Sequence, residues 1–338
     1  MTHPVSIAVD AMGGDFGPRI TVPAAFTCLS KYPELKLIFT GDQAAIKAAL
    51  PADAQTFHDR YQIRHTASVV EMDEQPSSAL RNKKDSSMAE ALKQVKAGEA
   101  NACVSAGNTG ALMALGRSIL GTHEGIDRPA FISEIPTLNG HCHVLDLGAN
   151  LDCTPRQLYQ FAVMGSIVSR AVDNCARPRV GLLNVGHEAV KGNELVRETA
   201  ELLSNQDHLN YIGFVEGDAI FSNQADIIVC DGFVGNVALK TSEGLAKMIR
   251  ELLLRAMKQN LWTRLVGLMI RPTFKRLSEQ IDPKNRNGAS LLGLEGIVIK
   301  SHGNADHASF CQAVTRAIRE VETDVPQLIR DSVLKHFF

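Results

Sequence analysis

The stretch VSIAVDAMGGDFGP, residues 5–18, decides the fold. It begins as a short apolar run, reaches Asp10, and continues through Asp15 among three glycines before Pro18. An apolar run bounded by glycine and proline predicts a buried strand that ends in a tight turn. The turn carries two acids, yet it offers no side chain suited to nucleophilic attack.

Similar apolar runs recur along the chain and predict further strands. Segments with three- and four-residue apolar spacing lie between them, and those at residues 88–97 and 110–120 predict helices. Strands that alternate with helices indicate an α/β fold, a mainly parallel Rossmann-like αβα sandwich. No linker or repeat divides the chain, so we expect a single domain over residues 1–338. The strands are expected at residues 6–10, 35–40, 62–65, 102–105, 143–147, 179–184, 211–214 and 226–230.

The composition excludes several classes of protein. The chain has 338 residues and a formal net charge of −2, so no basic field predicts a nucleic-acid partner. Its seven cysteines are odd in number and form no CxxC pair, which indicates reduced thiols and no zinc motif. We find neither a signal peptide nor an apolar run of about 18 residues, so we expect a cytoplasmic location.

Glycine-rich polar stretches follow most of the expected strands. Any one of them is ordinarily a plain turn, but glycine also permits close approach of backbone to a ligand. In parallel α/β sheets, ligands bind at the carboxyl ends of strands, so the set together predicts a binding site there. The stretches are DAMGGD (10–15), VSAGNTGAL (104–112), LDLGANLD (145–152), LNVGHEAVKGNE (183–194), EGDAI (216–220), DGFVGNVALK (231–240) and SHGNAD (301–306).

Two of these stretches suggest an anion site. In SAGNTGAL, Gly107, Asn108 and Thr109 precede a helix start, where free N–H groups and the helix dipole attract phosphate. Asn108 or Thr109 can equally cap that helix, and the two interpretations are compatible. In NVGHEAVKGNE, Glu188 and Lys191 lie three residues apart and can form a surface ion pair. The alternative is that Lys191 is a cation that binds phosphate.

Residues 240–276 differ from the rest of the chain and predict an amphipathic helical hairpin inserted into the domain. They hold nine Lys or Arg against two Glu, and a very apolar stretch follows the first helical pattern. A basic amphipathic hairpin is typical of an interfacial membrane anchor. A dimer-packing helix pair or a docking face for an acidic carrier protein are the alternatives. The residues expected to contact the membrane are Trp262, Leu265, Leu268, Met269 and Ile270.

These motifs are together similar to a known family. From Val9 to Asp306, AVDAMGGDFGP, SAGNTGA, DLGAN, NVGHE…KG, EGD, DGFVGN and SHGNAD resemble, in order and spacing, the PlsX family of bacterial phosphate acyltransferases. The resemblance implies a fold like that of phosphotransacetylase and the isocitrate and isopropylmalate dehydrogenases. It also implies a homodimer that associates peripherally with the anionic membrane surface.

The resemblance implies the reaction of acyl-[acyl carrier protein] with orthophosphate. The products are an acyl-phosphate and the free carrier protein, and a glycerol-3-phosphate acyltransferase consumes the acyl-phosphate downstream in phospholipid synthesis. Because phosphate is itself the nucleophile, no serine or cysteine need be acylated, which fits the lack of a nucleophile motif.

We therefore hypothesise the following roles. Asn108 and Thr109 bind phosphate with Lys191 as counter-charge, and His302 carries the proton because its reference pKa is nearest neutrality. No cofactor or metal is required, although clustered aspartates leave Mg²⁺ open. The expected catalytic residues are Lys191, Asn236, His302 and Asp231. The expected substrate-binding residues are Asp10, Gly13, Gly14, Asp15, Gly107, Asn108, Thr109, Asn150, Glu188, Gly235 and Asn304.

Two rival functions remain open from the sequence. A decarboxylating dehydrogenase on the related fold would need a nucleotide site, but neither GxGxxG nor GxxxxGK[ST] occurs in the chain. A non-catalytic membrane scaffold of lipid synthesis would not need so many polar strand ends.

Overall fold

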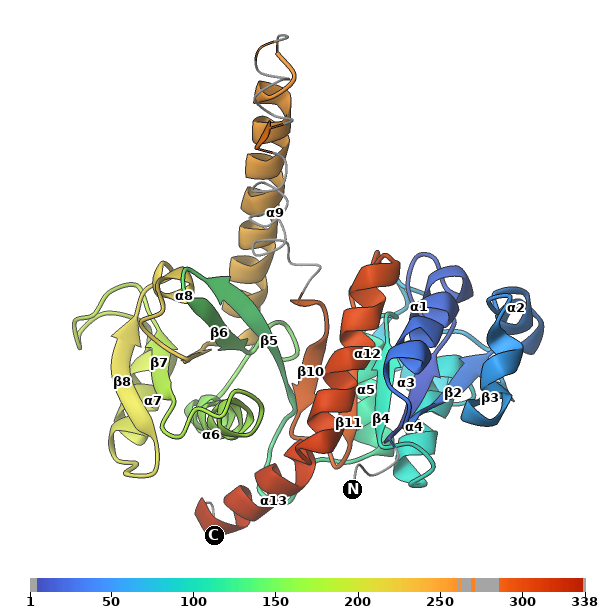
Figure 1. Ribbon diagram of the computed structural model, residues 1–338. Coiled ribbons are helices and arrows are strands. Elements are labelled where there is room, and N and C mark those ends of the chain that lie inside the picture. The colour runs from blue at the N-terminus through green and yellow to red at the C-terminus, as the bar shows by residue number, and fades with distance from the viewer. Residues whose placement is uncertain (1–4, 260–261, 263–268, 271–285, 337–338) are drawn as a thin grey trace.

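The computed structural model describes residues 5–259, 262, 269–270 and 286–336, and these form one sheet with helices on both faces (Figure 1). The eleven strands lie side by side in the order β3-β2-β1-β4-β11-β10-β5-β6-β9-β7-β8. Their bounds are β1 Val5–Asp10, β2 Leu35–Gly41, β3 Tyr61–His65, β4 Ala102–Ser105, β5 Ala130–Thr137, β6 Gly140–Leu145, β7 Arg179–Leu183, β8 Asn210–Val215, β9 Ile227–Val229, β10 Ala289–Leu292 and β11 Ile297–Lys300.

The sheet consists of two parallel groups that run in opposite directions. Strands β1, β2, β3, β4 and β11 pair in parallel, and so do β6, β7, β8 and β9. Between the groups, β11 with β10, β10 with β5, and β5 with β6 pair antiparallel. The carboxyl ends of the two groups therefore point to opposite edges of the sheet.

Helices cover both faces because residues along each strand alternate in direction. Ile7 and Val9 of β1 are buried with residues of α1 and α12, whereas Ala8 lies in a second core with α4 and α5. A third core joins β6 and β9 to α6 and α13. The helices are α1 Pro18–Lys31, α2 Gln43–Ala48, α3 Pro76–Asn82, α4 Ser87–Lys96, α5 Thr109–Ile119, α6 Pro155–Val172, α7 Glu194–Ser204, α8 Ala219–Ser222, α9 Gly232–Ala256, α12 His307–Glu322 and α13 Val325–His336, with a 3₁₀ helix η1 at Ala54–Arg60.

The predicted α/β class and the covered, mainly parallel sheet are confirmed. All eight expected strands are present, with the strand expected at residues 143–147 displaced to Gly140–Leu145. The expected helices at 88–97 and 110–120 are α4 and α5. Strands β5, β10 and β11 were not predicted, and these are the central strands at which the direction of the sheet reverses.

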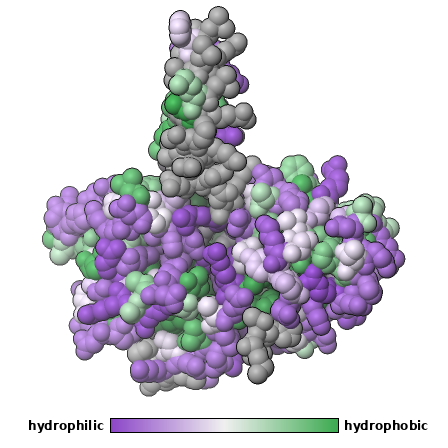
Figure 2. Space-filling view, viewed as in Figure 1, coloured by the Kyte–Doolittle hydropathy of each residue, from purple (hydrophilic) through white to green (hydrophobic). Residues whose placement is uncertain are grey.

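Helix α9 projects from the body of the protein (Figure 1). It begins at Gly232 and runs without interruption through position 240, where the amphipathic segment was expected to start. Apolar residues are exposed along it and appear in green on the projecting helix in Figure 2. The exposed apolar side chains of its outer half are Leu245, Met248, Ile249, Leu252, Leu253 and Leu254.

Only part of the expected membrane-contacting set belongs to the described residues. Trp262 is 78% exposed and Met269 is 82% exposed, and Ile270 is also exposed. Leu265 and Leu268 lie outside the residues that the structure describes. Among the described helices, none is both long enough and apolar enough to cross a membrane.

The first turn of α9 packs very closely against the turn that follows β6. The amide of Gly232 donates to the carbonyl of Asn150 at 2.8 Å. A Cβ on Gly232 would lie 2.6 Å from that same oxygen, and a Cβ on Gly235 would overlap the carbonyl oxygen of Asp146. Glycine is required at both positions because any side chain would push α9 away from the sheet.

We predict that Gly235→Ala destabilises the protein by about 3 kcal/mol, the upper end for overpacking in a rigid site. Gly244→Ala is the matched control on the same helix, because no atom lies within 4 Å of its Cβ position. That control should be neutral or stabilise by up to about 1 kcal/mol, since alanine favours helix over glycine. Denaturant unfolding of both variants measures the difference, and equal stabilities would contradict the close packing.

Candidate active site

A cavity of about 800 Å³ lies between α9, the central strand β5 and the residues that follow β11. Most of its wall area is apolar, and polar side chains enter it from several segments, chiefly α5, α9 and the end of β11. Such a combination is typical of a site that orients one polar group of an otherwise apolar ligand. The apolar residues are Phe131, Ile135, Leu138, Leu147, Phe221 and Leu239, and the main polar ones are Thr109, Asn236, Lys240, Glu243, Lys300, Ser301 and His302.

Lys300 supplies a positive charge to this cavity. Its ammonium donates to the backbone carbonyls of Ala106 and Ser301, so carbonyl dipoles are its nearest hydrogen-bonding partners among the described residues. Burial, aided by the nearby charge of Lys240, lowers the pKa of Lys300 to about 8. A desolvated lysine is charged at neutral pH here, and an anion in the cavity would stabilise that charge further.

His302 lies beside a lysine and a glutamate of α9. Its Nε2 is 3.5 Å from Oε1 of Glu243, and the ammonium of Lys240 donates to Oε2 of the same carboxylate at 2.9 Å. Burial lowers the pKa of His302, although the Glu243 charge opposes that shift. His302 is therefore neutral at pH 7 and can accept a proton from a bound acid.

Gly13 and Gly14, in the loop after β1, pack closely against the loops that follow β4 and β11. A Cβ on Gly13 would lie 2.7 Å from the amide nitrogen of Gly107, and one on Gly14 would lie 2.8 Å from the carbonyl oxygen of Gly303. Gly14 also has a φ of +87°, which side chains rarely adopt. The amide of Asp15 donates to Gly303 at 2.8 Å, while the Asp15 side chain is exposed.

Asp10 orients the loop that precedes α5. Its Oδ2 accepts the hydroxyl of Ser105 at 2.6 Å, and the Ser105 oxygen in turn accepts the amide of Gly107 at 3.0 Å. Burial raises the pKa of Asp10, and the Ser105 hydrogen bond opposes the rise. This carboxylate thus acts on the loop and does not face the cavity.

The Asn108 side chain is used to fix the start of α5. Its Oδ1 caps the helix by accepting the amide of Ala111 at 3.0 Å, and its Nδ2 donates to three carbonyls of residues 71–74. The neighbouring Thr109 lines the cavity. First-turn amides have no partners within their own helix, and the Asn108 cap satisfies only that of Ala111. The phosphate-site and capping interpretations are therefore compatible here.

Of the two expected site asparagines, Asn150 and Asn236, only Asn236 lines the cavity. Asn150 is 2% exposed, and its Nδ2 donates to the carbonyl of Pro129 and to Oδ2 of Asp146. The same Asp146 carboxylate accepts the amides of Phe131, Ala149 and Asn150. Asn150 thus builds the turn after β6, whereas Asn236 lines the cavity.

The structure does not bring Glu188 and Lys191 to this cavity. Both are exposed in the loop after β7, where the amide of Lys191 donates to the carbonyl of Glu188 at 2.9 Å. The neighbouring Gly192 and Asn193 border a second, mostly apolar cavity of about 760 Å³ beside α9. The positive charge near Thr109 comes instead from Lys240 and Lys300.

The remaining expected residues, Asp231, Gly235 and Asn304, do not line the cavity. Asp231 caps α9 by accepting the amide of Val234 at 2.9 Å, and it borders the second cavity. Gly235 allows the close packing of α9, and Asn304 is exposed on the loop before α12. Lys300 is not among the residues expected from the sequence, although a lysine that ends the apolar run GIVIK directly before SHGNAD is a usable signal.

The fold is shared with two classes of enzyme. A phosphotransacetylase from Streptococcus pyogenes superposes with a TM-score of 0.63 at 17% identity, and the match covers 94% of each chain. A putative 4-hydroxythreonine-4-phosphate dehydrogenase from Salmonella typhimurium gives a TM-score of 0.52 at 13% identity over 94% of this chain and 99% of the other. At these identities the likeness establishes the fold: that of the phosphotransacetylases and dehydrogenases of this type.

The sequence comparisons define the family within that fold. The family model described as "Fatty acid synthesis protein" matches residues 5–328. A phosphate acyltransferase of Methylococcus capsulatus is 56% identical over 332 residues, or 98% of each chain. One from Halorhodospira halophila is 52% identical over 97% of this chain and 96% of its own. The chain belongs to the phosphate acyltransferase family and is an acyltransferase enzyme.

We predict that Asp10→Ala lowers the free energy of unfolding by about 1–3 kcal/mol, because it leaves the buried Ser105 hydroxyl without its acceptor. Asp15→Ala is the control on the same loop, and it should change stability by less than about 0.5 kcal/mol because that side chain is exposed. Thermal or denaturant unfolding measures both. An Asp10→Ala variant as stable as the control would show that the loop does not depend on this carboxylate.

Proposed function

We propose that this enzyme transfers a long-chain acyl group from acyl carrier protein to orthophosphate, giving an acyl-phosphate for phospholipid synthesis. One observation carries the proposal: a cavity with largely apolar walls that also brings together Lys240, Lys300, His302 and the start of α5. An acyl chain fits the apolar wall, and an anion fits the polar groups. The name shared by the relatives supports phosphate as the acceptor.

Phosphate would bind where the α5 N-terminus meets the two lysines. Thr109 offers its hydroxyl and the unpaired amide expected of a first helical turn, and the helix dipole favours an anion there. Lys300 and Lys240 add two positive charges to the same cavity. We assign the counter-charge to these lysines in place of Lys191, because Lys191 does not line the cavity.

The reaction then needs little from the protein beyond positioning and charge. A phosphate oxygen attacks the thioester carbonyl carbon, the new C–O bond forms, and the C–S bond breaks with its electron pair on the carrier thiolate. Neutral His302 accepts a proton from phosphate and can return it to the leaving thiolate. We assign to Asn236, which lines the cavity, the hydrogen bond to the carbonyl oxygen, and one such donor is worth roughly 3 kcal/mol.

We propose in addition that the protein is cytoplasmic and binds the membrane surface peripherally through α9 as a homodimer. Exposed apolar residues along α9 and its basic residues Lys247, Arg250 and Arg255 support an interfacial helix. The second cavity beside α9 offers an apolar face that suits subunit packing. A downstream glycerol-3-phosphate acyltransferase would consume the acyl-phosphate.

One assay tests the proposed reaction against its rivals. The protein is incubated with acyl carrier protein loaded with a long acyl chain, and release of the free carrier thiol is followed with and without phosphate. Release that depends on phosphate supports the proposal. Release that is indifferent to phosphate, or turnover that requires NAD, contradicts it and favours a hydrolase or a dehydrogenase.

We predict that Lys300→Met lowers the catalytic efficiency for phosphate about 100-fold, because it removes a preorganised charge from the cavity. Lys300→Arg should retain more activity and differ from the wild type in pH dependence. The wild-type affinity for phosphate should fall as pH rises through about 8, where Lys300 loses its proton. The arginine stays charged, so its phosphate KM should not rise in that range. Identical pH profiles for wild type and Lys300→Arg would exclude Lys300 as the titrating group.

We predict that Ala246→Leu shifts the acyl preference toward shorter chains. Ala246 lines the cavity from α9, and a larger side chain there should cost about tenfold in efficiency for the longest donors. Lys247→Leu is the control, because the neighbouring Lys247 is exposed and does not line the cavity. Competition between donors of different length measures the preference, and a parallel loss for every length would argue against an acyl cavity.

A further inference from the structure

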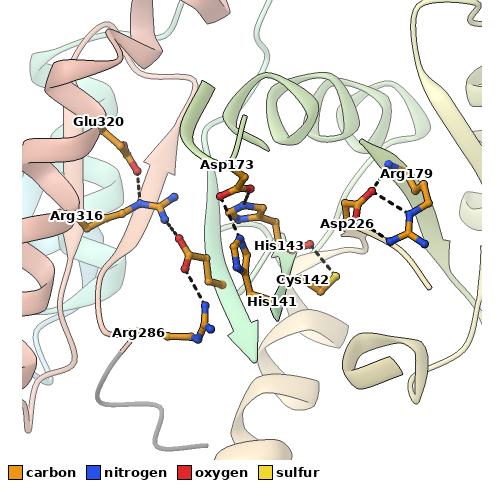
Figure 3. Close-up of polar contacts among 10 residues, drawn as sticks. His141, Cys142, His143, Asp173, Arg179, Asp226, Arg286, Arg316 and Glu320 are labelled. Carbon is orange, nitrogen blue, oxygen red and sulfur yellow. Dashed lines mark hydrogen bonds and ion pairs between the residues drawn. The ribbon is translucent and has the colours of Figure 1, made fainter. Parts of the chain in front are cut away.

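Four potential metal ligands from three segments meet beside the central strands. Glu134 lies on β5, His141 and His143 lie on β6, and Asp173 follows α6. One ligand atom from each of the four residues lies within 4.8 Å of those of the other three. Figure 3 shows both histidines pointing toward Asp173, and Arg286 and Arg316, which donate to Glu134, lie to the left of the histidines.

The fold brings these residues together through the β5–β6 hairpin. Glu134 is directly opposite His143 in the antiparallel register, and His141 lies two residues from His143 on the same face of the sheet. Asp173 is the C-cap residue of α6, the helix that packs on that face. His141 and His143 have an H-x-H spacing that puts both rings on one face of β6, and strand pairing and the end of α6 bring Glu134 and Asp173 to them.

The histidine nitrogens converge on one carboxylate. Nε2 of His141 lies 3.1 Å from Oδ1 of Asp173, and Nε2 of His143 lies 2.6 Å from Oδ2. The two imidazole rings are 5.1 Å apart between centroids. His143 is 1% exposed, and its Nδ1 has no hydrogen-bond partner among the described residues. Buried polar atoms normally have a hydrogen-bond partner that replaces the water lost on folding, and Nδ1 of His143 has none among the described residues.

The Glu134 carboxylate is already oriented by two arginines. Arg316 donates to Oε1 of Glu134, and Arg286 donates to Oε2 at 3.1 Å. Arg316 in turn donates to Glu320 at 2.7 Å, so its guanidinium is itself held in place. Carboxylate ligands of metal ions are commonly hydrogen-bonded in this way, which fixes their direction.

We propose that Glu134, His141, His143 and Asp173 bind one divalent transition-metal ion of the zinc type. Two imidazoles with two carboxylates are a donor set that suits Zn²⁺ and its neighbours, whereas Mg²⁺ and Ca²⁺ take oxygen ligands. Metal–ligand bonds of about 2.0–2.2 Å place tetrahedral ligand atoms roughly 3.4 Å apart. The present separations of up to 4.8 Å therefore require contraction of up to about 1.4 Å by side-chain rotation.

The site would differ from the candidate active site in place and in effect. His141, His143 and Asp173 do not border the acyl cavity, and only Glu134 reaches its edge. An ion here would link the β5–β6 hairpin to the end of α6 and so stabilise the folded state. The simpler alternative is a cluster of ion pairs without a metal, and the test must separate the two.

The test measures zinc binding by the full-length protein, independently of acyl transfer. Protein stripped with a chelator is titrated with Zn²⁺ in competition with a chromophoric chelator, and the melting temperature is recorded with and without Zn²⁺. We expect one ion per chain and a higher melting temperature. His141→Gln and Asp173→Asn should each weaken binding at least about tenfold, since each removes one ligand.

Two control variants separate this cluster from other donors. His58→Gln removes an exposed histidine beside Asp59, and Cys175→Ser removes a thiol two residues from Asp173. Both should bind zinc as the wild type does. Cobalt in place of zinc gives a readout that needs no variant: visible ligand-field bands without thiolate charge transfer are expected. A wild type that binds no zinc, binding unchanged by His141→Gln and Asp173→Asn, or thiolate bands with cobalt would each overturn the proposal.

Discussion

The close packing of α9 against the turn after β6 is the contact on which the arrangement of the site depends. Gly232 and Gly235 let the helix backbone approach the carbonyls of Asn150 and Asp146. Four hydrogen bonds to the Asp146 carboxylate, three of them buried, hold that turn in place. Because α9 is anchored at this end, the polar residues of its next two turns enter the cavity together with those that follow β11.

Hydrogen bonds and burial together set the charges of the polar side chains in the cavity. Lys300 is held by carbonyl dipoles, and Glu243 accepts from Lys240 and faces His302. Burial lowers the pKa of both Lys300 and His302. The result is a cavity in which two lysine ammonium groups lie together with a neutral imidazole suited to proton transfer. That combination suits a reaction in which the nucleophile arrives as a substrate.

The sequence predicts the parallel parts of the fold and misses the reversal between them. Strands such as β1 and β4 are apolar runs followed by glycine-rich turns, so the sequence pattern finds them. Glu134 and Pro136 interrupt the apolar pattern of β5, whereas β10 and β11 are apolar runs as long as β4 that were not counted as strands. These unpredicted strands place Lys300 in the cavity and pair Glu134 with His143. Asn236, His302 and Thr109 were found because they stand in polar strand-end motifs, whereas the position of Lys191 depends on a loop path that spacing does not encode.

The central claim is that phosphate itself attacks the thioester, with no acyl-enzyme between. The most direct measurement uses phosphate labelled with ¹⁸O at all four oxygens and mass spectrometry of the product. Attack by phosphate predicts an acyl-phosphate that retains all four labels, and no acylated protein when phosphate is withheld. A covalent acyl-enzyme that accumulates without phosphate, or unlabelled fatty acid as the first product, would contradict the account.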